Sequence, residues 1–154
     1  MHIREAVPDD VPDLKELWTE FMNYHSDLDS DYTLSDDALT NWAEYLDAKF
    51  DDSLAKIFVA VEDEIVVGYV GAMIRMYPPV WTITRYGYIE EIAVTKNFRR
   101  KGTASRLLAA AQKWLLSEGI SRIKVNIDSA NEASQGFFRS QGFLDNTETL
   151  IKKY

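Results

Sequence analysis

The sequence has 154 residues and a net charge of −8, from 25 acidic and 17 basic residues. This length predicts one domain (residues 1–154) with a single core, and the acidic balance argues against general nucleic-acid binding, which needs a basic face. No apolar run approaches the ~20 residues of a membrane span, the N-terminus is too charged for a signal peptide, and there is no cysteine. We therefore expect a cytoplasmic protein with no membrane partner, no nucleic-acid partner and no thiol nucleophile.

Two helices follow a short opening strand in the predicted order of elements. Residues 2–7 alternate between apolar and polar side chains, as in a half-buried strand. Asp10 is placed to cap a helix, because apolar residues recur with helical spacing over 11–22. The stretch 24–35 is rich in Asp and Ser, has no apolar period and reads as a loop. Ser35 at its end resembles the N-cap of a second amphipathic helix.

The middle of the chain predicts an antiparallel hairpin. Residues 55–61 and 65–75 read as strands, and a tight acidic turn separates them. Gly68 and Gly71 lie inside the second strand, where a glycine indicates a bulge or a close approach by another element. Two prolines exclude a central strand from 77–81, whose aromatic residues form either a substrate wall or a surface plug.

A further strand at 86–94 carries two adjacent glutamates, Glu90 and Glu91. Neighbouring side chains face opposite sides of a strand, so one glutamate faces the interior or a cleft unless a bulge intervenes. A basic turn at 97–104 then leads into an amphipathic helix over 105–118. The remaining predicted elements are a strand at 122–128, a short helix after residue 131 and a last strand at 147–154.

The basic turn has the features of a phosphate site. The first N–H groups of a helix have no partner within it, and that end carries a partial charge of roughly +0.5. Gly102 lets a phosphate approach the backbone, and Arg99, Arg100 and Lys101 add positive charge. A solvated surface turn is the alternative. The pattern is neither a P-loop nor a dinucleotide fingerprint, because it has one glycine and no Gly-Lys-Ser/Thr.

A second motif, NEASQGFFRSQGF at 131–143, follows the turn by a helix and a strand. At this spacing the two motifs resemble those of the GNAT superfamily, the acyl-CoA-dependent N-acetyltransferases. The family's turn reads Arg/Gln-x-x-Gly-x-Gly/Ala, and Arg99, Gly102 and Ala104 match it. Its later motif reads Asn, then Ala three residues on, then Leu-Tyr and Gly-Phe. The residues that match this later motif in register are Asn131, Phe137, Gly142 and Phe143.

The later motif departs from the family at two positions, where Ser134 replaces the alanine and Phe138 replaces the tyrosine. That tyrosine is the family's usual general acid for the leaving thiolate, and phenylalanine has no proton to give. The candidates that remain are solvent and three other tyrosines, Tyr24, Tyr32 and Tyr88.

The resemblance implies an α/β (α+β) GNAT fold. Its sheet would be mixed and mostly antiparallel, with about six or seven strands splayed after the fourth strand, beyond Val94, and about four flanking helices. Acetyl-CoA would lie in that opening as the cofactor, and no metal is implied. The resemblance implies that the cofactor-binding residues are Ile92, Ala93 and Val94 for the pantetheine arm, Arg99, Arg100, Lys101, Gly102, Thr103, Ala104 and Ser105 for the pyrophosphate, and Asn131, Ser134 and Phe138 farther along.

The reaction implied by the resemblance is direct attack of an amine on the thioester. An alkyl ammonium has a pKa near ~10.4, so a group that accepts its proton is useful at neutral pH. Glu90 is the first candidate for this catalytic base, since it matches the glutamate of the YIEE-type strand in diamine and some aminoglycoside acetyltransferases, and Glu91 is the second. In the alternative, both glutamates form surface salt bridges.

The hypothesis is therefore an acetyl-CoA-dependent N-acetyltransferase acting on a primary amine of a small molecule. The negative net charge and the acidic loop with Asp27, Asp29 and Asp31 are compatible with a cationic substrate. One alternative is a protein or peptide N-acetyltransferase. The other, motivated by Phe138, is a non-catalytic acyl-CoA-binding module. The resemblance also allows a homodimer.

Overall fold

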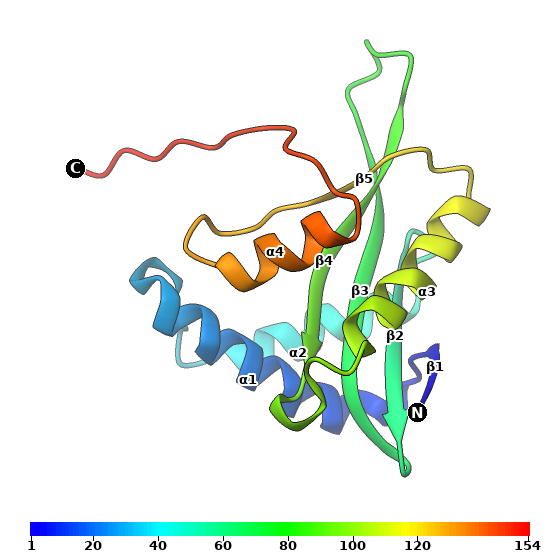
Figure 1. Cartoon of the computed structure of the whole chain (residues 1–154), viewed down its shortest axis with the longest axis vertical. Coiled ribbons are helices and arrows are strands. Elements are labelled where there is room, and N and C mark those ends of the chain that lie inside the picture. Colours follow the sequence, from blue (N-terminus) through cyan, green and yellow to red (C-terminus); the bar gives the residue numbers. More distant parts are fainter.

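A five-stranded sheet runs through the computed structural model, which describes residues 1–154 (Figure 1). The strands lie side by side in chain order, and their bounds are β1 (His2–Glu5), β2 (Ala55–Glu62), β3 (Ile65–Met76), β4 (Arg85–Val94) and β5 (Ile123–Val125). Each neighbouring pair is antiparallel except β4 and β5, which are parallel. The prediction of a mixed, mostly antiparallel sheet is confirmed.

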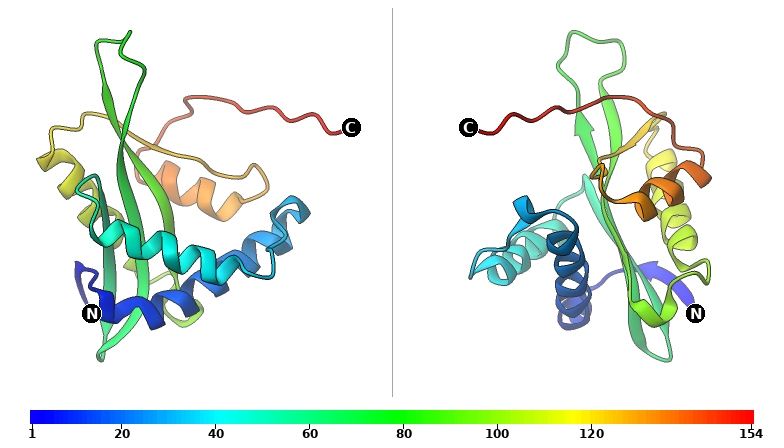
Figure 2. Two further views of the ribbon diagram at one scale, coloured as in Figure 1. Left: turned by 180° about the vertical axis from the view of Figure 1, so that it is seen from behind. Right: turned by 60° about the vertical axis from the view of Figure 1, so that its left-hand side comes forward.

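Four α-helices cover the sheet: α1 (Val11–Leu28), α2 (Ala38–Phe50), α3 (Thr103–Ser117) and α4 (Glu132–Ser140). Three short 3-10 helices complete the chain, η1 (Pro8–Asp10), η2 (Ser30–Tyr32) and η3 (Lys96–Phe98). The right-hand view of Figure 2 shows α1 and α2 on one side of the sheet and α3 and α4 on the other. None of these helices combines the length and the apolar character needed to cross a membrane.

Each face of the sheet has its own apolar core. On one face, α3 buries Leu107, Leu108 and Leu115, which recur at helical spacing, against the sheet. On the other face, the rings of Trp18 from α1 and Trp42 from α2 stack with their centroids 5.0 Å apart. The two cores fix all four helices relative to β4, the strand that carries the glutamate pair.

The sheet has five strands, so the expected count of six or seven is wrong. The segment 147–154 has strand-favouring residues but pairs with no other strand. A strand is stable only where a neighbour satisfies its backbone N–H and C=O groups, and this segment runs outward from α4 instead (Figure 1). Leu150 and Ile151 within it are consequently 85% and 76% exposed.

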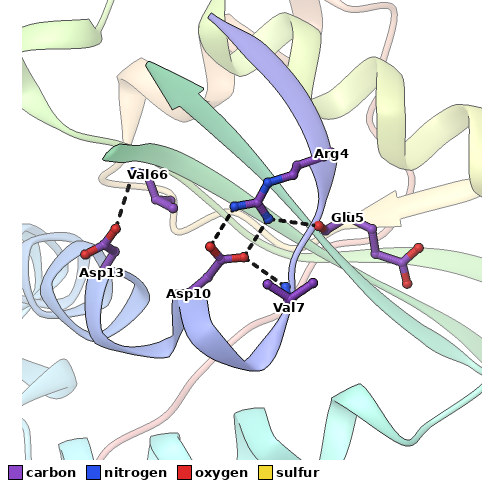
Figure 3. A network of polar contacts seen from close by, with 6 residues as sticks. All are labelled: Arg4, Glu5, Val7, Asp10, Asp13 and Val66. Carbon is purple, nitrogen blue, oxygen red and sulfur yellow. Dashed lines mark hydrogen bonds and ion pairs between the residues drawn. The ribbon is translucent and has the colours of Figure 1, made fainter. Parts of the chain in front are cut away.

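An ion pair, and not the predicted cap, fixes the start of α1 (Figure 3). The buried carboxylate of Asp10 accepts hydrogen bonds from Nη1 and Nη2 of Arg4 at 2.7 and 2.8 Å and from the N–H of Val7 at 2.8 Å. It makes no cap bond to α1. The hydrogen bonds from Arg4 lower the pKa of Asp10, despite its burial. β1 is thereby tied to the beginning of α1.

Candidate active site

A β-bulge brings Glu90 and Glu91 to the same face of the sheet. In the ladder between β3 and β4, Gly71 pairs with Glu91 and the next residue, Ala72, pairs with Ile89, so Glu90 is the extra residue. Ile89 is buried in the core beneath α3, whereas both glutamates line a small cavity beneath α2 on the other side. The glutamate pair and Gly71 left a bulge open as one of two alternatives, and the structure has the bulge.

The strands β4 and β5 separate at the bulge. They pair from Gly87 with Ile123 to Ile89 with Val125, whereas β4 continues to Val94. The sheet is splayed as expected, but the opening begins at Glu90 and not at Val94, because β5 is short. A cavity of about 300 Å³ occupies the opening. It is lined by Phe21, Met22, His25, Tyr32, Tyr88, Ile89, Glu90, Glu91, Ile92, Val125, Asn126, Ile127, Asp128, Asn131, Ser134 and Phe138.

Two buried side chains of the second motif reach the cavity from α4. Asn131 is the N-cap of this helix, and its side-chain oxygen accepts a hydrogen bond from the N–H of Ser134 at 3.1 Å. Its side-chain NH2 group is not used within the protein and remains available to a ligand. Phe138 packs edge-to-face between Phe137 and Phe143, with ring centroids 5.0 and 5.2 Å away. The position of the family's tyrosine is therefore an apolar part of the cavity wall.

Glu90 lies between the large cavity and a small one beneath α2. Its carboxylate accepts a hydrogen bond from the hydroxyl of Tyr45 and forms an ion pair with Nζ of Lys49. The Lys49 side chain is only 9% exposed, and its Nζ also lies 4.4 Å from the centre of the Tyr45 ring. Burial lowers the pKa of Lys49 to about 8, an effect that the negative charge of Glu91 opposes.

Neither partner of Glu90 was predicted from the sequence. Tyr45 and Lys49 are four residues apart and so lie on one face of α2. A signal for Lys49 was available, because it follows Trp42 and Leu46 at the spacing of the buried helix face, where an unpaired lysine is costly. No sequence pattern identifies its partner Glu90, which is 41 residues away.

Glu91 is held more deeply, among aromatic side chains of α1, α2 and β3. Its Oε2 accepts a hydrogen bond from the hydroxyl of Tyr69 at 2.6 Å. Burial raises the pKa of Glu91, and the Tyr69 hydrogen bond and the charge of Lys49 only partly oppose this. Burial and the nearby carboxylate also raise the pKa of Tyr69 well above its usual value. Glu91 therefore joins the sheet to the α1–α2 layer as well as lining the cavity.

Removing the Glu91 charge should change how stability depends on pH. The raised pKa means that the folded state binds this proton more tightly than the unfolded chain does. Its contribution to the free energy of unfolding therefore falls as the pH rises from its ordinary pKa, near 4.5, through the raised value. As the pH rises over this range, we expect the free energy of unfolding, measured by urea denaturation at each pH, to fall less for Glu91→Gln than for the wild type. Glu44→Gln, at an exposed position of α2, should follow the wild-type profile; identical profiles for all three proteins would contradict the assignment.

The turn before α3 presents backbone N–H groups that have no acceptor within the protein. These groups belong to residues 100–105, and the first intrahelical bond is made by the N–H of Arg106. Arg100 and Gly102 have left-handed φ values of 59° and 79°, and turns of this kind form concave, anion-binding arrangements of N–H groups. A Cβ on Gly102 would meet no atom within 4 Å, so the space over the turn is open. Arg100 and Lys101 are exposed and have no carboxylate partner.

The Arg99 side chain is held by hydrogen bonds within the protein. Its Nε donates to the carbonyl of Val94 at 2.8 Å, and its Nη2 donates to Glu20 of α1 at 2.9 Å. The side chain of Thr103 is also turned inward, donating to the carbonyl of Phe98 at 3.3 Å. These contacts fix the turn against β4 and α1 and leave its backbone to face outward.

The expected site residues thus fall into two groups. The structure brings six of them together around the cavity: Glu90, Glu91, Ile92, Asn131, Ser134 and Phe138. Ala93, Val94 and the turn 99–105 lie outside the cavity lining, farther along β4 and at the start of α3. Of the three tyrosines considered as proton donors, Tyr32 and Tyr88 line the cavity and Tyr24 does not.

A model of the Acetyltransferase (GNAT) family matches residues 12–143. The chain belongs to the GNAT family. As a member, it is an acetyl-CoA-dependent acetyltransferase, as the two motifs led us to expect. It is 33% identical over 118 residues to an aminoglycoside N(6')-acetyltransferase type 1 of Salmonella typhimurium, an alignment that covers 75% of this chain and 78% of that one.

Solved structures share the fold over nearly the whole chain. A tetramutant of the BH1408 protein from Bacillus halodurans superimposes with a TM-score of 0.89 at 20% identity, over 100% of both chains. The aminoglycoside N-acetyltransferase AAC(6')-Iy, in complex with the bisubstrate analogue CoA-S-monomethyl-acetylneamine, superimposes with a TM-score of 0.76 at 22% identity, over 99% of this chain and 97% of that one. The GNAT fold is thereby confirmed.

Proposed function

We propose that this acetyltransferase acetylates a primary amine of a small, cationic molecule. The observation that carries the proposal is the pair of carboxylates, Glu90 and Glu91, that the bulge turns toward one cavity. Asp128 adds a third carboxyl group to the cavity wall, which contains no lysine or arginine. A cavity of about 300 Å³ is within the range of small-molecule sites. The Salmonella relative is an aminoglycoside acetyltransferase, and aminoglycosides are polyamines that carry several positive charges.

The cofactor would lie along the free edge of β4, from the turn to the cavity. The unused N–H groups of residues 100–105 would hold the pyrophosphate, with Arg100 and Lys101 adding charge. The pantetheine arm would bond to the backbone near Ile92 and Ala93, since Arg99 already occupies the carbonyl of Val94. The free NH2 group of Asn131 would contact the cofactor nearer the cavity, and Phe138 would pack beside the sulfur.

In the proposed reaction the amine nitrogen attacks the thioester carbon, the C–S bond breaks, and CoA leaves as a thiolate. Deprotonating an alkyl ammonium at pH 7 costs roughly 4–5 kcal/mol, so a proton acceptor contributes directly to rate. Glu90 takes this role, with Tyr45 and Lys49 holding its carboxylate in place. Departure of the CoA thiolate depends less on a general acid, because a thiol has a pKa near ~8.5. Tyr88 and Tyr32 are the hydroxyl groups in the cavity wall that can supply its proton.

An amine screen tests the proposal. The protein is incubated with acetyl-CoA and aminoglycosides, diamines, amino acids or lysine-containing peptides, and thiol release is followed. We expect release above the rate of hydrolysis with small polyamines. Faster release with peptides would instead favour a protein acceptor. CoA binding without transfer to any amine would favour the non-catalytic module, and gain of activity in Phe138→Tyr would then identify the missing hydroxyl as the reason.

A further inference from the structure

The guanidinium of Arg75, on β3, lies beside the cavity and has no acceptor within the protein. Its Cζ is 3.6 Å from the centre of the ring of Tyr88, which lines the cavity. The half-buried Arg75 side chain takes part in no ion pair and no hydrogen bond. Stacking on an aromatic ring uses the flat face of a guanidinium and leaves the N–H groups at its edge free. These donors are therefore available to a ligand.

Arg75 and Glu90 lie on the same face of the sheet. Arg75 follows Met73 by two residues on β3, so their side chains project to the same side. The hydroxyl of Tyr45, on α2, lies 3.9 Å from Sδ of Met73 and donates to Glu90, which places both on the α2 side. Burial lowers the pKa of Lys49, the ion-pair partner of Glu90, to about 8, and the nearby positive charge of Arg75 contributes to this shift. Arg75 is therefore an electrostatic neighbour of the proposed base.

A second cation, Lys124 of β5, extends the positive charge along this face. Lys124 is the β5 neighbour of Tyr88, and its Nζ lies 4.7 and 4.9 Å from the ring centres of Tyr77 and Tyr86. It forms no ion pair. The helices α1 and α2 lie across the lower half of this face, and the β3–β4 hairpin extends beyond them (Figure 2). In a chain with a net charge of −8, two cations that flank one tyrosine without a carboxylate partner indicate a site for an anionic group.

We propose that Arg75, aided by Lys124, binds a carboxylate of the acceptor, so that the acceptor is a diamino acid and not an unsubstituted polyamine. This inference rests on the proposed function, since it takes Glu90 as the place of the reacting amine. A guanidinium presents parallel N–H donors that match the two oxygens of a carboxylate. A diamino acid with one carboxylate still has a net positive charge, which agrees with the three carboxyl groups of the cavity wall.

The spacing of the two groups selects among diamino acids. Tyr88, on which Arg75 stacks, precedes Glu90 by two residues, and two residues of a strand span roughly 7 Å. An extended chain advances roughly 1.2 Å per bond, so about five or six bonds join an amine at Glu90 to a carboxyl carbon at Arg75. The δ-amine of ornithine and the ε-amine of lysine have this separation. An α-amine is much closer to its own carboxylate and cannot reach Glu90 while the carboxylate is bound to Arg75.

Matched acceptors test the carboxylate site. Ornithine and putrescine differ only by the carboxylate, and ornithinamide keeps the size of ornithine without that charge. Calorimetry of each acceptor with the protein and CoA measures binding, and thiol release from acetyl-CoA measures kcat/KM. For the wild type we expect ornithine to exceed both other acceptors by roughly 10- to 100-fold in affinity and in kcat/KM, the size expected for hydrogen bonds to a charged group. Equal values for ornithine and putrescine, or for ornithine and ornithinamide, would overturn the proposal and leave amine acetylation intact.

Arg75→Gln assigns the preference to this side chain. It removes the charge and the fork of donors, so the values for ornithine should fall to those for putrescine. Arg139→Gln, at an exposed position of α4, is the matched control and should keep the wild-type ratio of ornithine to putrescine. An Arg75→Gln variant that keeps this ratio would overturn the proposal. If neither acceptor releases thiol, the proposed function fails, and the ratio of the two affinities in calorimetry alone confirms or overturns the carboxylate site.

Discussion

Gly102→Glu should abolish CoA binding while leaving the fold intact. Gly102 is the N-cap of α3, with φ at 79°, and the space over it is open, so the new side chain would not clash within the protein. It would instead put bulk and negative charge where the unused N–H groups of residues 100–105 converge, which is where the pyrophosphate is proposed to sit. We expect the CoA dissociation constant from calorimetry to rise by at least ~100-fold, or about 2.7 kcal/mol.

Gly102→Ala is the matched control for this change. A left-handed φ is unfavourable for any residue with a Cβ, at roughly 1–2 kcal/mol, and alanine and glutamate share that cost. Alanine adds neither charge nor length, so Gly102→Ala should lose stability to a similar extent but retain most of its CoA affinity. If Gly102→Glu bound CoA as the wild type does, the turn would not be the pyrophosphate site. If both variants lost binding equally, the conformation of the turn and not its charge would be responsible.

The turn could be predicted because its features are local. A glycine before a helix, flanked by basic residues, sets both the unpaired N–H groups and the charge within a few residues of sequence. The bulge could also be considered from the sequence, since two adjacent glutamates conflict with the alternation of side chains between the two faces of a strand. In both cases the relevant atoms are close together in the chain or directly paired in a hairpin.

The features that were missed depend on contacts between distant segments. Lys49 and Tyr45 reach Glu90 only because α2 packs across the sheet face on which Glu90 lies, and no local sequence pattern predicts that packing. The carboxylate of Asp10, expected to cap α1, is used by Arg4 of β1 instead. The segment 147–154 has the composition of a strand, but whether it becomes one depends on a partner edge that the sequence does not identify.

Glu90→Gln should lower kcat/KM for the amine by about 10²- to 10⁴-fold, the usual contribution of a positioned acid or base, with CoA affinity unchanged. The loss should be largest below the pKa of the substrate amine and should diminish above it, where the amine is already neutral and needs no acceptor. Rates of thiol release across a pH series, with the amine identified in the screen, measure this. A variant whose pH profile matches that of the wild type would exclude Glu90 as the base. Glu44→Gln, at the exposed position of α2, is the control for loss of a carboxylate on the surface.

The ion pair between Glu90 and Lys49 makes the Glu90→Gln result ambiguous, and a double variant that also replaces Lys49 removes this ambiguity. Removing one member of a buried ion pair leaves the other charge uncompensated, at a cost of about 3–5 kcal/mol, whereas replacing both members is often neutral. Glu90→Gln would leave the nearly buried Lys49 unpaired, and a loss of activity could then reflect a displaced α2. The double variant Glu90→Gln/Lys49→Met removes the unpaired cation and should recover stability in urea denaturation. If Glu90 is the base, the double variant recovers stability but not turnover. If Glu90 serves only as the partner of Lys49, turnover returns together with stability, and the proton must go to another group in the cavity.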